Sequence, residues 1–328
     1  MIDRRRFLRV SSLAASTWPL TAFAQKVPVA IGFLGGQPQP PAQDPQGNAL
    51  IQGFVDNGLV IGRDITFESR FTAGDDARYP ELARELARLN VRIILSNTPA
   101  GVRAAQRLEP AVPIVMTAMS DPVASGLVNS LAHPGNHTTG TASLNEDVTP
   151  KLLEFLREIV PKARTLAVLY NPSNSTNSLM MDNLQAKAIP LGISVKRYAL
   201  HASRDLDPLF SMLTSNPPDA LQLISDATLN EYLSKRIADY AIANRLPSLS
   251  SNESSFENGV LLAYGASTRK MLRRTGYYVR RILEGAIAGD LPIEQPTGFE
   301  LFINTKTAKA IGVEIPATLL ARADRTIE

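Results

Sequence analysis

Short apolar runs alternate with stretches of helical periodicity along almost the whole chain, and this order restricts the fold more than any other feature. Val29–Leu34 has the length and composition of a buried strand and ends at two glycines. Such alternation builds a parallel sheet with helices on both faces. The first series predicts strands at 29–34, 64–70, 92–96, 113–118 and 136–143, and helices near 50–57, at 79–89 and after Pro99.

A second series of the same kind begins near residue 146. It predicts strands at 165–170, 194–200, 220–225, 247–250 and 260–264, and helices at 151–160, 177–189, 205–214 and 229–241. A long helix at 270–288 and a short one at 305–311 follow, in a tail that is too small for a third domain. A mature chain of about 300 residues exceeds what one core usually holds. The sequence therefore predicts an α/β protein with two doubly wound, Rossmann-like lobes.

The first 24 residues have the pattern of an export signal. Asp3–Arg9 is a basic start that resembles the twin-arginine signal, although a Sec signal stays open. The apolar stretch over 13–23 is too short to span a bilayer. The small residues of Ala22–Ala24 predict cleavage before Gln25. We therefore expect residues 1–24 to be removed and the mature protein to be soluble in the periplasm.

Charge and cysteine content argue against several classes of protein. The chain carries 34 Lys+Arg and 31 Asp+Glu, and removal of the leader takes away four Arg and one Asp. The mature chain is then formally neutral, which gives no electrostatic case for a nucleic-acid partner. There is no cysteine, so a disulfide, a thiol nucleophile and a lipid anchor on cysteine are all excluded.

The common motifs of enzymes are missing. The sequence has no G-x-S-x-G elbow, no P-loop and no G-x-G-x-x-G after the first strand. His133 and His137 have the spacing of a helical metal pair, but Pro134 and Gly135 lie between them and oppose a helix. We expect no catalytic residue, no metal site and no cofactor.

Polar residues follow the predicted strands of both series. Ligands of open parallel sheets bind beyond the carboxyl ends of the strands, so these residues are the candidate ligand-binding set. The set is Gly36, Gln37, Asn97, Thr98, Ser120, Asp121, Tyr170, Asn171, Ser173, Ser175, Asp226, Asn252 and Tyr264. Small polar residues also form turns and cap helices, so for each one a purely structural role stays open.

Many short pieces, in order and at matching spacing over residues 27–326, resemble one known family. They are Ser96–Ala100, Ser120–Val123, Pro134–Asn136, Leu169–Asn171, Ile224–Asp226, Phe299–Leu301, Ala308–Gly312 and Ile315–Asp324. The chain resembles the substrate-binding proteins of ABC transporters, in the group of the tryptophan and tyrosine receptors, which are type I periplasmic binding proteins. The first loop, over 35–47, departs from the family because it is long and carries four prolines, which leaves the choice of ligand open.

The resemblance implies two lobes that close on a small molecule about a hinge of three crossings. Lobe one would be 27–143 plus about 268–292, and lobe two 146–267 plus about 293–328. The ligand would be an amino acid, aromatic or a related small acid or amide, delivered by a monomer to an ABC permease in the inner membrane. Asp226 would hold the ammonium group of the ligand, and Ser173 and Ser175 would hold the carboxylate of the ligand.

Two alternatives remain at this stage. An exported α/β enzyme that acts on a small acid has the same architecture, and fold alone does not exclude it. A regulator core of the repressor type would need a DNA-binding headpiece, and the leader occupies that place. Asp226 has a second role open as well, because it could simply cap the helix that follows it.

Overall fold

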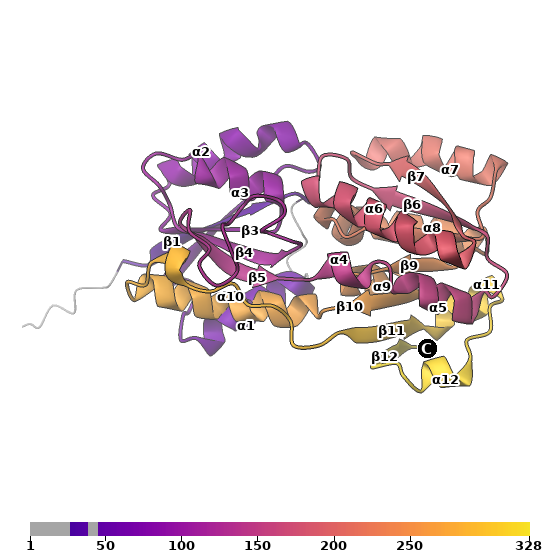
Figure 1. Ribbon diagram of the computed structural model, residues 1–328. Helices are drawn as coiled ribbons and strands as arrows, with labels where there is room; N and C mark the ends of the chain where they lie inside the picture. Colours follow the sequence, from indigo (N-terminus) through magenta and orange to yellow (C-terminus); the bar gives the residue numbers. More distant parts are fainter. Residues whose placement is uncertain (1–26, 39–44) are drawn as a thin grey trace, which may run out of the picture.

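The computed structural model describes residues 27–38 and 45–328, with side chains in the second range from Asn48 onward. Its described residues form two α/β lobes, one after the other along the long axis of the molecule (Figure 1). The predicted export signal and residues 39–44 of the proline-rich loop lie outside the described residues.

The first lobe is built on a five-stranded sheet with all neighbours parallel, in the order β2-β1-β3-β4-β5. Its strands are β1 Val29–Gly35, β2 Ile65–Phe71, β3 Ile93–Ser96, β4 Ile114–Met119 and β5 Thr138–Ala142. Its helices are α1 Pro45–Asp56, α2 Tyr79–Arg88, α3 Pro99–Gln106 and α10 Thr268–Leu283. In Figure 1, α2 and α3 lie above this sheet and α10 lies below it.

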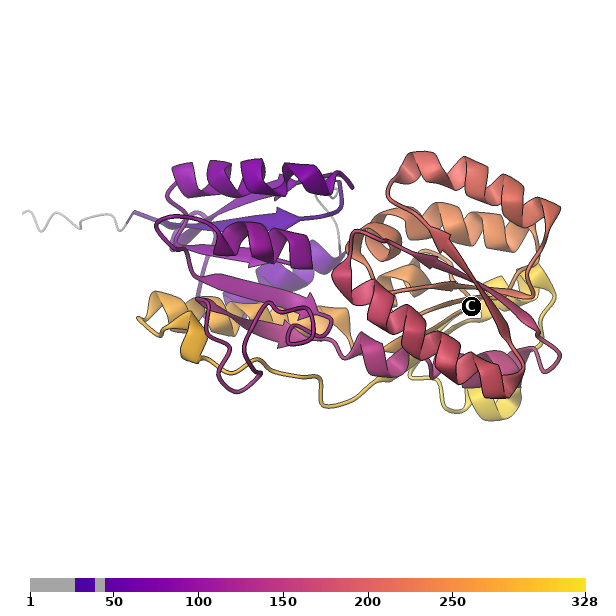
Figure 2. The same cartoon turned by 45° about the horizontal axis from the view of Figure 1, so that its top comes forward.

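Helix α10 returns late in the sequence to cover the first sheet beside α1 (Figure 2). Its apolar side, with Leu272 and Val279, joins Leu50 and Phe54 of α1 in one core cluster against the sheet. The two helices touch at a glycine: a Cβ on Gly276 would lie 1.9 Å from the carbonyl oxygen of Gly53. Only glycine permits this backbone approach, which fixes α10 to the first lobe.

The second lobe has a seven-stranded sheet in the order β12-β11-β10-β9-β8-β6-β7. Its strands are β6 Thr165–Tyr170, β7 Ser194–Ala199, β8 Ala220–Leu223, β9 Ser248–Ser250, β10 Leu262–Gly265, β11 Glu300–Asn304 and β12 Arg325–Ile327. Strands β6 to β10 are parallel to one another, whereas β11 pairs antiparallel with β10 and β12 runs parallel to β11. The tail, which is too small for a third domain, thus extends the edge of the second sheet with β11 and β12.

Helices cover both faces of the second sheet. They are α4 Asn145–Val148, α5 Leu152–Ile159, α6 Ser175–Ala188, α7 Leu206–Ser215, α8 Ser234–Ala243, α9 Glu253–Glu257, α11 Thr305–Ile311 and α12 Ala317–Leu320. Apolar residues of α5 and α6 pack in one core cluster, and those of α7 and α8 pack in another. The predicted α/β class with two doubly wound lobes is confirmed.

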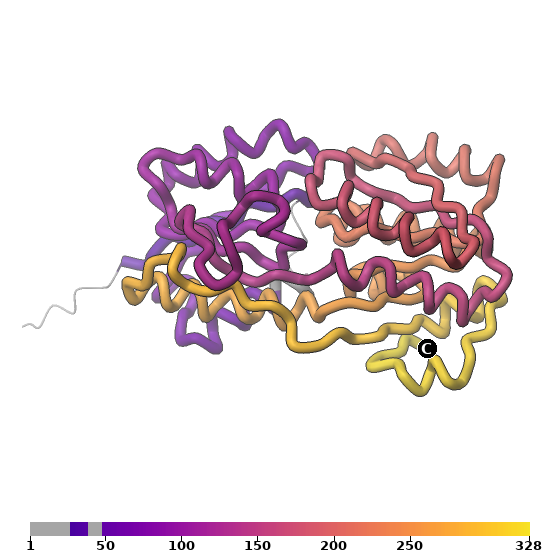
Figure 3. Tube along the Cα trace, in the orientation of Figure 1, coloured from indigo at the N-terminus to yellow at the C-terminus, as the bar shows by residue number. Residues whose placement is uncertain are grey.

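The chain passes between the two sheets at three places, which can be followed along the tube of Figure 3. The first crossing joins β5 to α4, and the second joins β10 to α10. The third runs from the end of α10 to β11, and Glu294 on it pairs with Thr141 of β5 before the chain leaves the first lobe. The parallel strands β1 to β5 and β6 to β10 of the two sheets have their carboxyl ends toward the space between the lobes.

Candidate ligand-binding site

A cavity of about 690 Å³ lies between the two lobes. This volume lies within the range of about 300–1,000 Å³ that is typical of binding sites for small organic molecules. From the first lobe it is lined by Phe33, Gln37, Pro38, Leu50, Phe67, Ser69, Phe71, Asn97, Pro99, Thr117, Ala118, Met119, Ser120 and Ser143, and by Thr268, Met271 and Leu272 of α10. From the second lobe it is lined by Asn145, Asn174, Thr176, Ser225, Asp226, Ala227, Glu231, Tyr232, Asn252, Ser254, Glu257, Asn258 and Ala266.

Asp226 follows β8 and is the buried carboxylate of this lining, with 7% of its surface exposed. Its Oδ2 accepts hydrogen bonds from Nδ2 of Asn171 at 3.2 Å and of Asn174 at 3.0 Å. Its Oδ1 accepts from the backbone N–H groups of Thr228 and Leu229. Burial raises the pKa of Asp226, while these donors oppose the rise. Asp226 therefore caps the helical turn Thr228–Leu233, which leads into α8, and it also lines the cavity. Its predicted contact with a ligand ammonium stays a prediction.

The loop after β6 is held by asparagines. Asn174 caps α6 by accepting from the N–H and the hydroxyl of Thr176, and both residues line the cavity. Asn171 accepts a hydrogen bond from the N–H of Ser173. Ser175, at the start of α6, accepts a 3.1 Å hydrogen bond from Arg103 of α3 in the other lobe. This loop thus supplies one cavity wall and one contact between the lobes.

In the first lobe, Asn97 faces the cavity and Thr98 faces away from it. Nδ2 of Asn97 donates to Oε1 of Gln37 at 3.2 Å, and both residues line the cavity. The hydroxyl of Thr98 donates to the hydroxyl of Tyr79 at 2.7 Å and accepts from the N–H of Gly101. Thr98 is therefore the N-cap of α3, tied to the core beneath that helix.

The first crossing carries a chain of polar side chains. Oγ of Ser120 and Oγ of Ser143 lie 3.2 Å apart. Asn145 donates to Oγ of Ser225 at 2.7 Å and to Oγ of Ser120 at 3.4 Å, and so joins the two lobes at the cavity floor. Asp121 instead accepts from the N–H of Ala124 and caps a turn outside the lining.

Aromatic and aliphatic side chains form the rest of the first-lobe wall. The ring of Phe33 lies 6.2 Å from that of Phe67 and 5.8 Å from that of Phe71, centroid to centroid. Leu50 of α1 and Leu272 of α10 close the wall beside these rings. The wall suits an aromatic or large apolar group of a ligand.

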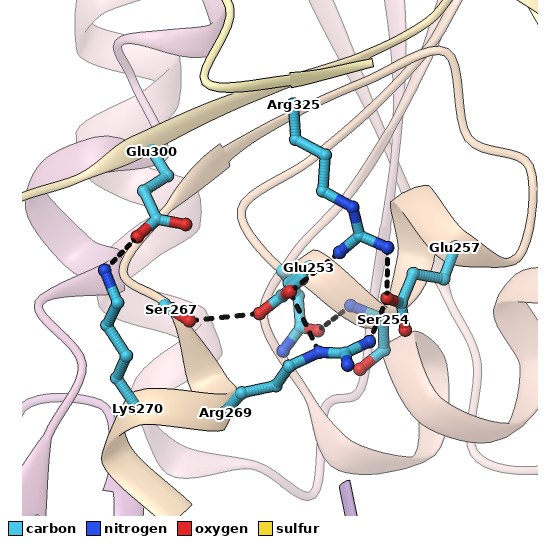
Figure 4. A network of polar contacts seen from close by, with 9 residues as sticks. Glu253, Ser254, Glu257, Ser267, Arg269, Lys270, Glu300 and Arg325 are labelled. Carbon is cyan, nitrogen blue, oxygen red and sulfur yellow. Dashed lines mark hydrogen bonds and ion pairs between the residues drawn. The ribbon is translucent and has the colours of Figure 1, made fainter. Parts of the chain in front are cut away.

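The charged groups of the described lining are all acidic: Asp226, Glu231 and Glu257. Glu257 of the lining and the buried Glu253 behind it share two guanidinium groups, from Arg269 and Arg325 (Figure 4). Burial raises the pKa of Glu253, and the neighbouring Arg269 opposes the rise. The C-terminal strand β12 therefore helps to hold the cavity-lining helix α9 through Arg325.

The structure gathers part of the predicted set around the cavity. Gln37, Asn97, Ser120, Asp226 and Asn252 belong to its lining. The others lie outside that lining in the described chain: Gly36, Thr98, Asp121, Tyr170, Asn171, Ser173, Ser175 and Tyr264. Most of these small polar residues turn back to cap or brace their own loops.

The two tyrosines of the set belong to the core of the second lobe. Tyr170 and Tyr264 both pack against one core cluster there. The ring of Tyr264 lies 5.1 Å from that of Phe155 in an edge-on contact. Both tyrosines thus have a packing role in this structure.

Several lining residues are not at strand ends and escape the sequence rule. Thr117 lines the cavity from within β4. The next residue, Ala118, has a φ of 54°, and the register between β4 and β5 shifts at this point. Ser254 lies in α9, a short helix that no long periodic pattern announces. A polar residue within an apolar strand, such as Thr117, is the one signal in the sequence that could have marked this position.

The described residues were also compared with the requirements of a metal site and of a membrane span. They contain no group of three or more His, Cys, Asp or Glu side chains that could hold a metal ion. Over the same residues, no helix is both long and apolar enough to cross a membrane.

Two lobes with a polar and aromatic cavity at their facing strand ends define a protein that encloses a small molecule. The chain belongs to the ABC transporter substrate binding protein family, whose model matches residues 39–327. The predicted family and function, a substrate-binding protein of an ABC transporter, are confirmed.

Known relatives cover most of the chain. A tyrosine-binding protein of Clostridioides difficile (strain R20291) is 27% identical over 275 residues, which are 84% of this chain and 78% of that protein. A conserved domain protein from Vibrio cholerae has a crystal structure with 26% identity and a TM-score of 0.77, covering 91% of this chain and 99% of that one. The ABC domain from Streptococcus pneumonia in complex with L-Trp has 21% identity and a TM-score of 0.78, covering 92% of this chain and 100% of that one.

Proposed function

We propose that this protein binds one aromatic amino acid in the interlobe cavity and delivers it unchanged to the permease of an ABC importer. The observation that carries the proposal is a single cavity that joins a phenylalanine wall to a buried carboxylate, Asp226. The wall would receive the ring and Asp226 the ammonium group. The name of the tyrosine-binding relative and the L-Trp of the Streptococcus structure support this class of ligand.

The ligand carboxylate would meet neutral donors, because the charged groups of the described lining are acidic. The hydroxyls of Ser120, Ser143 and Ser225 are the donors that the cavity floor offers. The predicted contact of Ser173 and Ser175 with the carboxylate stays a prediction. In the structure both residues lie outside the lining, on either side of Asn174. An aromatic acid without an amine would bring a second negative charge beside Asp226, and we expect such acids to bind weakly.

Hinge closure would trap the ligand. Lobe one would be 27–143 plus about 268–292, and lobe two 146–267 plus about 293–328, a division that sheet membership and the packing of α10 on α1 support. Contacts between the lobes, such as Arg103 to Ser175, support a closed arrangement in this structure. Opening would break these contacts and expose the cavity.

The setting of the protein follows from the proposed transport role. Residues 1–24 would direct export and be cleaved before Gln25, leaving a free periplasmic protein without a lipid anchor. We expect a monomer that carries out no reaction, with the permease as its partner. N-terminal sequencing of the exported protein tests the cleavage site.

Two measurements test the function. The first is mass spectrometry of the small molecule released when the mature protein is gently unfolded. The second is calorimetry with the aromatic amino acids, each expected to bind at one site per chain and to be recovered intact. Absence of binding to every aromatic amino acid would overturn the ligand class. Chemical conversion of the bound molecule would favour the enzyme alternative.

A further inference from the structure

The apolar wall of the cavity lies on one face of the first sheet. Phe33 of β1 belongs to the core cluster under α1 and α10, and Phe67 and Phe71 of β2 pack against the same cluster. Leu95 of β3 and Val115 of β4 belong to that cluster too. Side chains two residues apart on a strand point to the same face. The residues that follow Leu95 and Val115 at this interval are therefore placed beside the phenylalanine rings.

Those residues are Asn97 and Thr117, and both line the cavity. Ser96 pairs with Met116 in the parallel ladder, so Asn97 and Thr117 come next on adjacent chains. Oδ1 of Asn97 and Oγ1 of Thr117 are buried and have no hydrogen-bond partner within the described chain. Thr117 has only 1% of its surface exposed. Buried polar atoms are nearly always paired, so an unpaired acceptor and an unpaired hydroxyl side by side indicate a missing partner.

We propose that Thr117 and Asn97 hydrogen-bond a polar group on the ligand's ring, either a phenol hydroxyl that pairs with both residues or an indole N–H that donates to one of them. This inference rests on the proposed function and adds which aromatic amino acids the site selects. A phenol hydroxyl can donate to the amide oxygen of Asn97 and accept from the hydroxyl of Thr117. An unsubstituted phenyl ring would bury both protein atoms without a partner, and a site built in this way rejects the ligand that lacks the group. The cavity therefore favours tyrosine or tryptophan over phenylalanine.

Ser254 provides the matched control. Its Oγ is also buried, unpartnered in the described chain and part of the lining, but it comes from α9 in the second lobe. The phenylalanine wall belongs to the first lobe, so Ser254 lies outside the face on which the ring is proposed to rest. Loss of its hydroxyl is expected to change the affinity for tyrosine and phenylalanine to the same degree.

The test is calorimetry of L-tyrosine, L-tryptophan and L-phenylalanine binding to the mature wild type, Thr117→Val, Thr117→Ser and Ser254→Ala. We expect the wild type to bind tyrosine or tryptophan at least about tenfold more tightly than phenylalanine. Thr117→Val should reduce this ratio about tenfold, with phenylalanine affinity unchanged or higher. Thr117→Ser should retain the ratio because it keeps the hydroxyl, and Ser254→Ala should retain it as well.

The outcomes separate the two proposals. If no aromatic amino acid binds the wild type, the proposed function fails. If they bind but Thr117→Val keeps the wild-type ratio, or if phenylalanine binds best, Thr117 and Asn97 do not select the ligand through the polar group of its ring. The proposed transport function would still stand. Thermal unfolding without ligand serves as the folding check, since removal of an unpaired buried hydroxyl should leave Thr117→Val at least as stable as the wild type.

Discussion

Oδ2 of Asp226 accepts a 3.0 Å hydrogen bond from Nδ2 of Asn174, and the two residues follow the adjacent strands β8 and β6. The bond joins Asn174, the cap of α6, to the carboxylate that caps the helical turn Thr228–Leu233. Because Asn174 and Asp226 both line the cavity, any change in this pair alters the cavity wall as well as the local fold.

Asp226→Asn is expected to lower both stability and ligand affinity. Asparagine and aspartate cap helices about equally well in general. This site differs, because an amide at 226 would turn a donor either to Asn171 and Asn174 or to the N–H groups of Thr228 and Leu229. We expect a loss of about 1–3 kcal/mol in the free energy of unfolding. Urea denaturation measures it.

The same variant also tests the ammonium contact. Calorimetry should compare an aromatic amino acid with its analogue that lacks the amine. If Asp226 holds the ammonium, Asp226→Asn reduces the preference for the amine-bearing ligand. An unchanged preference, in a protein that still binds, would limit Asp226 to its capping role.

Thr98 is expected to affect stability more than binding. Its hydroxyl caps α3 and bonds Tyr79, so Thr98→Ala should cost about 1 kcal/mol of unfolding free energy with little change in ligand affinity. Thr98→Ser keeps the cap and is the control. Thr98→Trp should destabilise the protein rather than block the cavity selectively, because Thr98 is buried. Denaturation and calorimetry on all three variants check this, and weak binding by a stable Thr98→Trp would contradict it.

The fold could be predicted from the sequence because strand and helix periodicities alternate cleanly, and the first series supplies β1 to β5 of one sheet and the second β6 to β10 of the other. The antiparallel direction of β11 could not, because residue periodicity carries no information on the direction in which a strand pairs. The helix α9 could not either, because five residues show too little of a helical period. Their places are set by tertiary pairing, as when β11 completes the edge beside β10.

The candidate site was predictable where it depends on strand ends, as for Asn97, Ser120 and Asp226. The phenylalanine wall was not, because a core residue and a cavity residue on one strand face have the same pattern. Whether a loop residue such as Thr98 faces the ligand or caps its helix depends on side-chain direction, which the spacing of residues does not carry. The binding role of each residue in the set stays a prediction.

Arg325 near the C-terminus is expected to matter for stability more than an ordinary surface arginine. It bonds Glu253 at 3.1 Å and Glu257 at 3.0 Å, and Glu253 has a side chain only 6% exposed. Arg325→Ala leaves Arg269 as the partner of both carboxylates, so we expect a loss of about 1 kcal/mol in unfolding free energy and weaker ligand binding through α9. Urea denaturation and calorimetry measure the two effects.

Arg322→Ala is the matched control for Arg325→Ala. Arg322 lies on the same tail and pairs with Glu158, and both side chains of this pair are substantially exposed. Exposed pairs contribute little, so Arg322→Ala should change neither stability nor binding beyond a few tenths of a kcal/mol. Equal effects of the two substitutions would mean that the Glu253 and Glu257 cluster has no special role.

Glu146 lies in α4, directly after the first crossing between the lobes, and Oε2 of its carboxyl group is buried without a partner in the described chain. Burial, followed by the charges of Asp121 and Asp147, raises the pKa of Glu146 from 4.5 to about 7. The folded protein therefore holds a proton that the unfolded chain releases between these two values. The contribution of Glu146 to stability is complete below about pH 4.5 and declines as the pH rises to about 7.

Glu146→Gln should remove this dependence, because an amide stays neutral at every pH. We expect the variant to match the wild type near pH 4 and to exceed it by about 1–2 kcal/mol of unfolding free energy at pH 8, after allowance for solvent screening. Urea denaturation across this range measures the difference between the two proteins, in which the titration of other carboxyl groups cancels. Asp147→Asn is the control, since Asp147 is exposed and influences Glu146 only through its charge. A constant difference between Glu146→Gln and wild type from pH 4 to pH 8 would contradict this, because it would mean that the pKa of Glu146 is the same in the folded and the unfolded protein.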